Sequence, residues 1–244
     1  MFSSVQNIKD IFMALYDRDY TNNSSMDYTI ENESASVSLV KKTYQYFAAS
    51  LLAGGFGAYA GITIIGAEAL MTYRWFIFIP WMLFGMFALP MLQKKETLAT
   101  IGLFVFTFVG GLVLTPLISM VMAKGGGGAT VGNAFLLASA MFGGLSLFAI
   151  NSKTDFSSFG KPLMIAFAIV FVGSILNIIF FHSPIMSVII SGAVLMISAF
   201  FVLVDTQNII AGAYETPVMG ALSLYINFFN MFQSLLVLLG IMDD

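Results

Sequence analysis

The sequence IMSVIISGAVLMISAFFVLV, residues 185–204, contains twenty residues and no Asp, Glu, Lys, Arg or His, and Asp205 follows it directly. An α-helix of about 20 apolar residues spans the roughly 30 Å hydrocarbon core of a bilayer. The run does not alternate apolar and polar residues, as a strand of a membrane barrel would. We therefore predict a membrane-spanning helix over 185–204 that ends at a carboxylate.

Similar apolar runs recur along the chain. Its 244 residues are 59% hydrophobic and 9% charged, with a mean hydropathy of +0.91. A soluble domain carries about 25% charged residues, so this composition excludes an ordinary water-soluble domain. We predict an all-α membrane protein with seven transmembrane helices, at 44–67, 75–92, 97–123, 129–150, 163–181, 185–204 and 217–241.

The first 43 residues differ from the rest and are predicted to form a polar tail before a transmembrane domain over 44–244. They hold six of the 13 acidic and four of the ten basic residues, and the stretch 21–38 has a composition typical of disorder. Apolar residues recur at helical spacing near the start, at Val5, Ile8, Ile11, Phe12 and Leu15. A helix on the membrane surface is one interpretation. A marginal helix in an unstructured tail is favoured, because flanking basic residues are lacking.

The distribution of Lys and Arg predicts how the helices are oriented. Eight of the ten basic residues fall on the side of the N-terminus, and Arg74 and Lys124 fall on the other. Loops rich in Lys and Arg remain in the cytoplasm. We therefore expect the N-terminus to be cytoplasmic and the lipid bilayer to surround the helices.

Several classes of chemistry are excluded by the residue counts. There is no Cys and a single His, His182, so thiolate and His-rich metal sites are not expected. The net charge is −3 and no basic run exceeds two residues, which argues against a nucleic-acid partner. No nucleophile with a base, no metal cluster and no Lys for a retinal Schiff base within 217–244 is found, so neither an enzyme nor a cofactor is expected.

Asp205 is the most informative polar residue. Ser198 and Ser191 precede it at steps of seven and share its helix face. A carboxylate at membrane depth is costly unless it faces a cavity or a partner. Two interpretations remain open: an ion or proton site, or a solvated acid at the cytoplasmic end of the helix.

The last predicted helix has a polar stripe on one face, formed by Ser223, Asn227, Asn230 and Ser234. An outer helix facing lipid would not favour two Asn residues, so this helix is expected to be central. The stripe fits either hydrogen bonds between helices or the lining of a pore.

Small residues at helical spacing predict close helix packing. They are found in the first helix at Gly54, Gly57 and Gly61, in the third at Thr107, Gly111, Thr115 and Ser119, and in the fourth at Gly143 and Gly144.

Four stretches of the chain resemble the Bax inhibitor-1 family of membrane proteins. They are VDTQ at 204–207, ALSLYIN at 221–227, FFNMF at 228–232 and KTDFS at 153–157. The resemblance extends over residues 40–244. It implies a seven-helix bundle in a bacterial cytoplasmic membrane, with the last helix in the middle. Family members are associated with a pH-sensitive calcium leak, and some bacterial members look like modulators of a membrane-bound protease.

The family pattern pairs an acid at the end of the sixth helix with an acid in the seventh. Here the first acid is present as Asp205, whereas Asn227 replaces the second. A basic residue that latches the acid pair in the family corresponds to Gln93, followed by Lys94 and Lys95. A lone acid has no twin with which to share a proton, so we expect a single titration step.

These observations predict a monomeric, pH-sensitive, calcium-permeable leak channel with a degenerate two-acid site. Asp205 would be a weak calcium site, and the ion path would include Asn227, Asn230, Ser198 and Ser223, with Gln93, Lys94 or Lys95 as a latch. Calcium enters as the permeating ion and not as a cofactor. The alternative is a non-conducting quality-control factor that modulates a membrane-bound protease.

Overall fold

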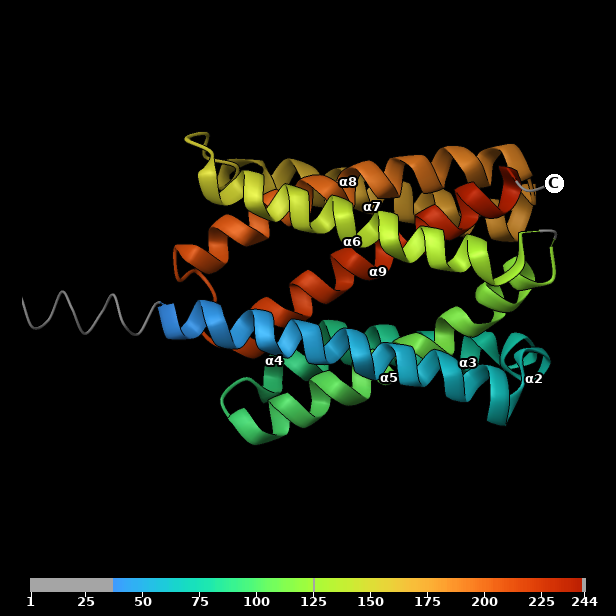
Figure 1. The fold of residues 1–244 in the computed structure, drawn as a ribbon, viewed down its shortest axis with the longest axis horizontal. Helices are drawn as coiled ribbons and strands as arrows, with labels where there is room; N and C mark the ends of the chain where they lie inside the picture. Colours follow the sequence, from blue (N-terminus) through green and yellow to red (C-terminus); the bar gives the residue numbers. More distant parts are fainter. Residues whose placement is uncertain (1–36, 125, 243–244) are drawn as a thin grey trace, which may run out of the picture.

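The computed structural model of the chain describes residues 37–124 and 126–242 (Figure 1). Within these residues, seven helices are long and apolar enough to cross a membrane. The predicted helix and disorder in residues 1–36 lie outside the described residues. The described part is thus the all-α, seven-span protein that the hydropathy pattern predicts.

The spans contain short irregularities where the helix tightens or widens. The first span is Val37–Ile65, and its last turn is the π-helix η1 (Gly61–Ile65). The remaining elements are α2 (Ala67–Thr72), α3 (Arg74–Leu83), η2 (Phe84–Ala88), α4 (Leu89–Leu92), α5 (Glu96–Met122), α6 (Gly127–Asn151), η3 (Ser157–Phe159), α7 (Gly160–Leu176), η4 (Asn177–Phe181), α8 (Pro184–Ile210) and α9 (Pro217–Met242).

Two helices are longer than predicted at the end that carries charged residues. The first span begins at Val37 and not at residue 44, so Lys41 and Lys42 are exposed on an extension of the helix. The sixth span, α8, continues past Asp205 to Ile210, so the prediction that this helix ends at Asp205 is wrong. A helix ends where its backbone can turn rather than at the first charge. Here the turn comes at Gly212, whose φ is 69°.

The last helix runs through the middle of the molecule. Figure 1 shows α9 crossing between one layer made of α6, α7 and α8 and a second layer made of the first span and α2 to α5. Helix α9 contacts α5, α6 and α8, whereas α7 packs on α8 and has no buried residue within Gly160–Leu176. The central position that the polar stripe predicts for the last helix is therefore observed.

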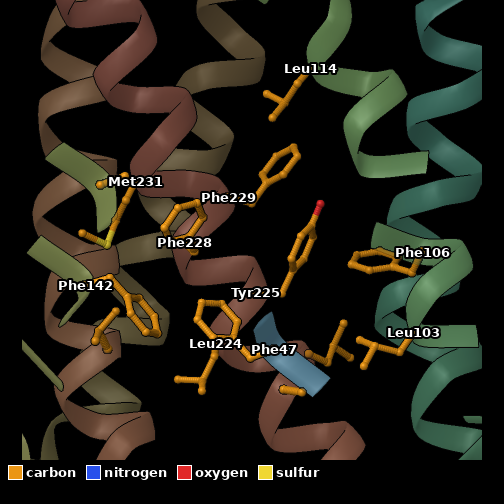
Figure 2. Close-up of a cluster of buried hydrophobic side chains, with 14 of the residues drawn as sticks. Phe47, Leu103, Phe106, Leu114, Phe142, Leu224, Tyr225, Phe228, Phe229 and Met231 are labelled. Atoms are coloured by element: carbon orange, nitrogen blue, oxygen red, sulfur yellow. The ribbon is translucent and has the colours of Figure 1, made fainter. Parts of the chain in front are cut away.

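Aromatic side chains fill the space around α9. Figure 2 shows Phe228 and Tyr225, which lie three residues apart on this helix, next to Phe142 and Phe106 respectively. Phe47 of the first span stacks on Phe142 with 4.6 Å between ring centroids. Tyr225 also donates a hydrogen bond of 3.0 Å to the carbonyl of Thr107. The middle of the bundle is thus a packed apolar core, in which the hydroxyl of Tyr225 forms its hydrogen bond with α5.

The first span and α5 approach each other through glycine. A Cβ placed on Gly57 would overlap the carbonyl of Phe108, and one on Gly111 would overlap the carbonyl of Gly54. The predicted close packing of these two helices is confirmed. A Cβ placed on Gly143 or Gly144 would meet no atom within 4 Å, so the same prediction is wrong for α6.

Candidate ion or proton site at Asp205

Asp205 lies inside α8, five residues before its end, and its side chain is only 5% exposed. Its neighbours Val202, Leu203, Val204 and Thr206 are also buried. The interpretation of Asp205 as a solvated acid at the end of a helix is therefore wrong. A buried carboxylate needs hydrogen bonds or a charge partner, because an unpaired charge is costly to remove from water.

Three neutral side chains donate hydrogen bonds to the Asp205 carboxylate. The Nδ2 of Asn227 donates to Oδ2 over 2.6 Å, and the hydroxyl of Ser223 donates to the same oxygen. The hydroxyl of Tyr214 donates to Oδ1 over 2.7 Å. Ser223 and Asn227 are four residues apart on α9 and so lie on one face of that helix. The polar stripe of the last helix thus meets the carboxylate of the sixth.

Tyr214 is the member of this cluster that the sequence did not indicate. It lies in the connection between α8 and α9, and its side chain reaches back to Asp205. Burial, followed by the negative charge of Asp205, raises the pKa of Tyr214 above the usual value for tyrosine. Tyr214 is therefore a neutral donor at physiological pH. The signal available was a lone aromatic residue in the otherwise small and polar connection at 211–216.

The predicted latch residues are not part of this cluster in the described conformation. Gln93, Lys94 and Lys95 form the turn between α4 and α5, and both lysines are exposed. The three donors to Asp205 within residues 37–124 and 126–242 come from α9 and the connection that precedes it. The carboxylate is thus held by hydrogen bonds from neutral groups. The latch, which was expected to hold Asp205 when the path is closed, stays a prediction.

Two other predicted site residues lie apart from Asp205. Ser198 is completely buried seven residues earlier on α8, and its hydroxyl has no hydrogen-bond partner among the described residues. Asn230 is half-buried one turn beyond Asn227 on α9. The structure therefore brings Asp205, Ser223 and Asn227 into contact, and leaves Ser198 and Asn230 further along the same two helices.

The cluster offers only oxygen and amide ligands. Asp205, Tyr214, Ser223 and Asn227 each carry a side-chain oxygen, which is the ligand type that hard cations prefer. One carboxylate supplies the only formal charge among these four side chains. Within the described residues no group of three His, Cys, Asp or Glu could hold a metal ion. Chemically, this arrangement suits a proton or one weakly held cation better than a tight metal centre.

These features define a class: a helical membrane protein of seven spans, with a central last helix and a buried carboxylate bonded to it. The family model described as "Inhibitor of apoptosis-promoting Bax1" matches residues 37–244. The chain belongs to this family, the Bax inhibitor-1 family, as the four sequence motifs predicted.

Relatives of the chain come from several bacteria. An uncharacterised protein of Campylobacter jejuni serotype O:2 is 42% identical over 232 residues, which cover 93% of this chain and 97% of that protein. An uncharacterised membrane protein of Vibrio cholerae serotype O1 is 29% identical over 225 residues, covering 92% and 97%. The Modulator of FtsH protease YccA of Escherichia coli strain K12 is 30% identical over 161 residues, covering 65% and 73%. The matching protein of strain O6:H1 is named inner membrane protein YccA.

Proposed function

We propose that this protein mediates a pH-sensitive leak of cations, calcium in particular, along α8 and α9, and that Asp205 is the gate. The observation that carries the proposal is a buried carboxylate whose three hydrogen-bond donors are all neutral. A carboxylate at membrane depth is by default a functional group, because its burial is costly.

The contacts of Tyr214 support a closed state of this gate. Tyr214 comes from the connection between two helices and occupies Oδ1 of Asp205. A cation would have to displace that hydroxyl to reach the carboxylate from this end of the bundle. Asn227 would also turn its amide, so that Oδ1 instead of Nδ2 faced the cation. Opening therefore requires at least two of the three hydrogen bonds to break.

The charge of the site sets its expected selectivity. Calcium takes six to eight oxygen ligands and gains from carboxylate charge. This cluster has one carboxylate, since Asn227 stands where the family pattern has a second acid. We expect weak calcium binding, low selectivity among cations, and one step in the pH dependence.

The test is calcium flux into proteoliposomes that contain the full chain. Asp205→Ala should abolish the flux or its pH dependence, because no other carboxylate among the described residues contacts this cluster. Asp155→Asn is the matched control, since Asp155 is an exposed acid in a loop. No flux above that of empty liposomes, at any pH between about 5 and 8, would reject the leak.

A second candidate function is modulation of a membrane-bound protease, without conduction. It is supported by the relative named modulator of FtsH protease, and by the aromatic packing that fills the middle of the bundle. In this case Asp205 would stabilise the fold. We expect the full chain, and the Asp205→Ala variant if it folds, to co-purify with such a protease from bacterial inner membranes. Absence of the protease from both preparations would reject this candidate.

The proposed location is the bacterial inner membrane with the N-terminus in the cytoplasm. The start of the first span, the turn between α4 and α5, and the loop after α6 lie at one end of the bundle (Figure 1). These segments carry Lys41 and Lys42, Lys94 and Lys95, and Lys153, respectively. Basic residues gather on the cytoplasmic side of membrane proteins. This distribution supports the proposed orientation, and we further propose that the protein is a monomer.

A further inference from the structure

The close contact between the first span and α5 is bordered by a groove on the outside of the bundle. The two backbones meet at Gly57 and Gly111, and larger apolar side chains flank this contact. The groove has a volume of about 440 Å³, within the range of about 300–1,000 Å³ that is typical of small-molecule sites. Its lining residues come from these two helices and are Ala53, Phe56, Ile101, Phe104, Val105 and Phe108.

The groove opens toward the hydrocarbon region of the membrane. Phe56 and Val105 are exposed on the surface of the chain, and both lie inside membrane spans. Every lining side chain is apolar, so a polar ligand group would lose its hydration there without gaining a hydrogen bond from a side chain. The occupant that suits this groove is therefore a hydrocarbon chain.

Lys42 lies on the same face of the first span as the groove. It precedes Ala53 by 11 residues and Phe56 by 14, which correspond to about three and four turns of an α-helix. Its side chain is exposed and forms no ion pair within residues 37–124 and 126–242. The first span thus presents a cation in line with the apolar groove.

Two further lysines lie at the corresponding end of α5. Lys94 and Lys95 belong to the turn that precedes this helix, both are exposed, and the turn lies at the same end of the bundle as the start of the first span (Figure 1). Glu96 follows them, so these three residues and Lys42, three lysines and one glutamate, carry a net charge of +2. Basic residues gather on the cytoplasmic side of membrane proteins in general, which explains the sign of this charge but not its alignment with a groove.

The length of the groove matches one leaflet of a bilayer. At a rise of about 1.5 Å per residue, Ile101 lies about 9 Å and Phe108 about 20 Å along α5 from Lys95. On the same scale, Ala53 lies about 17 Å along the first span from Lys42. One leaflet supplies half of the roughly 30 Å hydrocarbon core. A lipid with an acyl chain in the groove would therefore hold its headgroup at the level of the lysines.

A second groove lies on the other side of Phe56. It has a volume of about 480 Å³ and is lined by Leu51, Leu52, Gly55, Phe56, Tyr59 and Phe135. Lys41 precedes Leu52 by 11 residues and so shares its helix face, as Lys42 does with Ala53. The two grooves share one phenylalanine, and each is in line with one of two adjacent cations. Such a pair fits a molecule with two acyl chains and one anionic headgroup.

We propose that the outer face of the first span binds an anionic phospholipid from the leaflet that meets Lys41 and Lys42. Its phosphate would lie near Lys42 and the turn between α4 and α5, and its acyl chains would occupy the two grooves. The charge of the headgroup distinguishes this occupant from bulk lipid, and its two chains distinguish it from a helix of another protein. The inference depends neither on the leak nor on the state of Asp205.

The test counts the lipids bound to the purified full chain by native mass spectrometry. Palmitoyl-oleoyl phosphatidylglycerol and palmitoyl-oleoyl phosphatidylcholine are added together in equal amounts, because they share their acyl chains and differ in the charge of the headgroup. For the first lipid bound, we expect phosphatidylglycerol to exceed phosphatidylcholine at least about fivefold, the gain expected from one lysine near an anionic headgroup. Equal binding of the two lipids by the wild type would overturn the proposal.

The headgroup contact is tested by Lys42→Gln combined with Lys95→Gln. This variant should lose most of the preference for phosphatidylglycerol, because two of the cations are removed. Lys153→Gln combined with Lys161→Gln is the matched control, since it removes the same charge from exposed lysines outside both grooves, and it should keep the preference. An unchanged preference in the first variant, or an equal loss in the control, would contradict a defined headgroup site.

The groove is tested by Ala53→Phe, which fills it and leaves every lysine in place. This variant should bind less phosphatidylglycerol than the wild type, whereas Ala168→Phe, at an exposed position of α7, should bind the same amount. If Ala53→Phe fails to fold, Val105→Phe narrows the same groove from α5. Wild-type binding by a folded groove variant would show that the lysines attract lipid without the groove, and would overturn the proposal.

Discussion

Asp205 shows how a membrane protein can bury a carboxylate that, among the described residues, is held by hydrogen bonds from neutral side chains and not by an ion pair. Its two oxygens accept bonds from Asn227, Ser223 and Tyr214. Sequence reasoning found the first two because helical spacing places them on one face. It could not find Tyr214, because the direction of a side chain in a connection depends on the path of the backbone. It also placed Asp205 at a helix end, since a hydropathy count stops at the first charge.

Substitution of Asn227 by Asp should restore a two-acid site. The new carboxylate would lie at hydrogen-bond distance from Asp205, and two such acids titrate as a coupled pair. We expect calcium binding to strengthen by about tenfold, equivalent to about 1.4 kcal/mol, and proton release to occur in two steps. Calorimetric titration with calcium at several pH values measures both. Asn230→Asp is the control, because Asn230 lies one turn further along α9. Unchanged affinity and pH response in Asn227→Asp would contradict the paired-site account.

Removal of the Tyr214 hydroxyl should loosen the closed site. A hydrogen bond to a charged group contributes about 1.5–3 kcal/mol to stability. We expect Tyr214→Phe to lower the unfolding temperature in detergent, as followed by circular dichroism, and to raise the leak.

The loss of stability in Tyr214→Phe should depend on pH in a definite direction. The pKa of Tyr214 is raised in the folded protein. Its contribution to stability is therefore complete below the usual tyrosine pKa of about 10, and is lost as pH rises through the folded value. Tyr214→Phe should be less stable than the wild type below about pH 10, and the difference should narrow above it. A constant difference across that range would contradict the burial of Tyr214 beside Asp205.

At the scale of elements, the number and class of the helices could be predicted from apolar run lengths, and their ends could not. The first span extends to Val37 because a helix can continue beyond the bilayer with Lys41 and Lys42 in water. Likewise, glycines at helical spacing predicted the contact between the first span and α5. A Cβ added at Gly143 or Gly144 would meet no neighbouring atom within 4 Å. The same argument failed for this pair because residue spacing alone does not say which face of a helix is covered by another.

The glycine contact predicts a sharp difference between two similar substitutions. Gly57→Ala would push a methyl group into the carbonyl of Phe108, and overpacking of this kind costs about 1–3 kcal/mol. Gly143→Ala meets no atom within 4 Å and should be neutral, or stabilising by about 0.5–1 kcal/mol. Thermal unfolding of the two purified variants compares them directly. Equal stability of the two variants would show that the first span and α5 are not packed as described.

At the scale of the whole molecule, the topology places the candidate site near one end of the bundle. The connection at 211–216, which carries Tyr214, lies at the same end as the loop that carries Lys153 and the start of the first span (Figure 1). If basic residues mark the cytoplasm, the proposed gate faces the cytoplasm. A one-sided site of this kind would sense the pH of that compartment.

Single-cysteine labelling in cells tests this orientation, because the natural chain contains no Cys. Lys153→Cys should be protected from a membrane-impermeant maleimide in intact cells whose outer membrane has been permeabilised. Tyr73→Cys, which replaces an exposed residue between α2 and α3 at the other end, should react. The opposite pattern would place the N-terminus outside the cytoplasm.

The account as a whole depends on one carboxylate, and the most direct measurement is the pH profile of calcium flux for the wild type and for Asp205→Asn in matched proteoliposomes. Asparagine keeps nearly the same shape as aspartate but cannot ionise. The account predicts a flux that changes in one step with pH in the wild type, and a flux without that step in the variant. An unchanged step in a folded Asp205→Asn protein would contradict it.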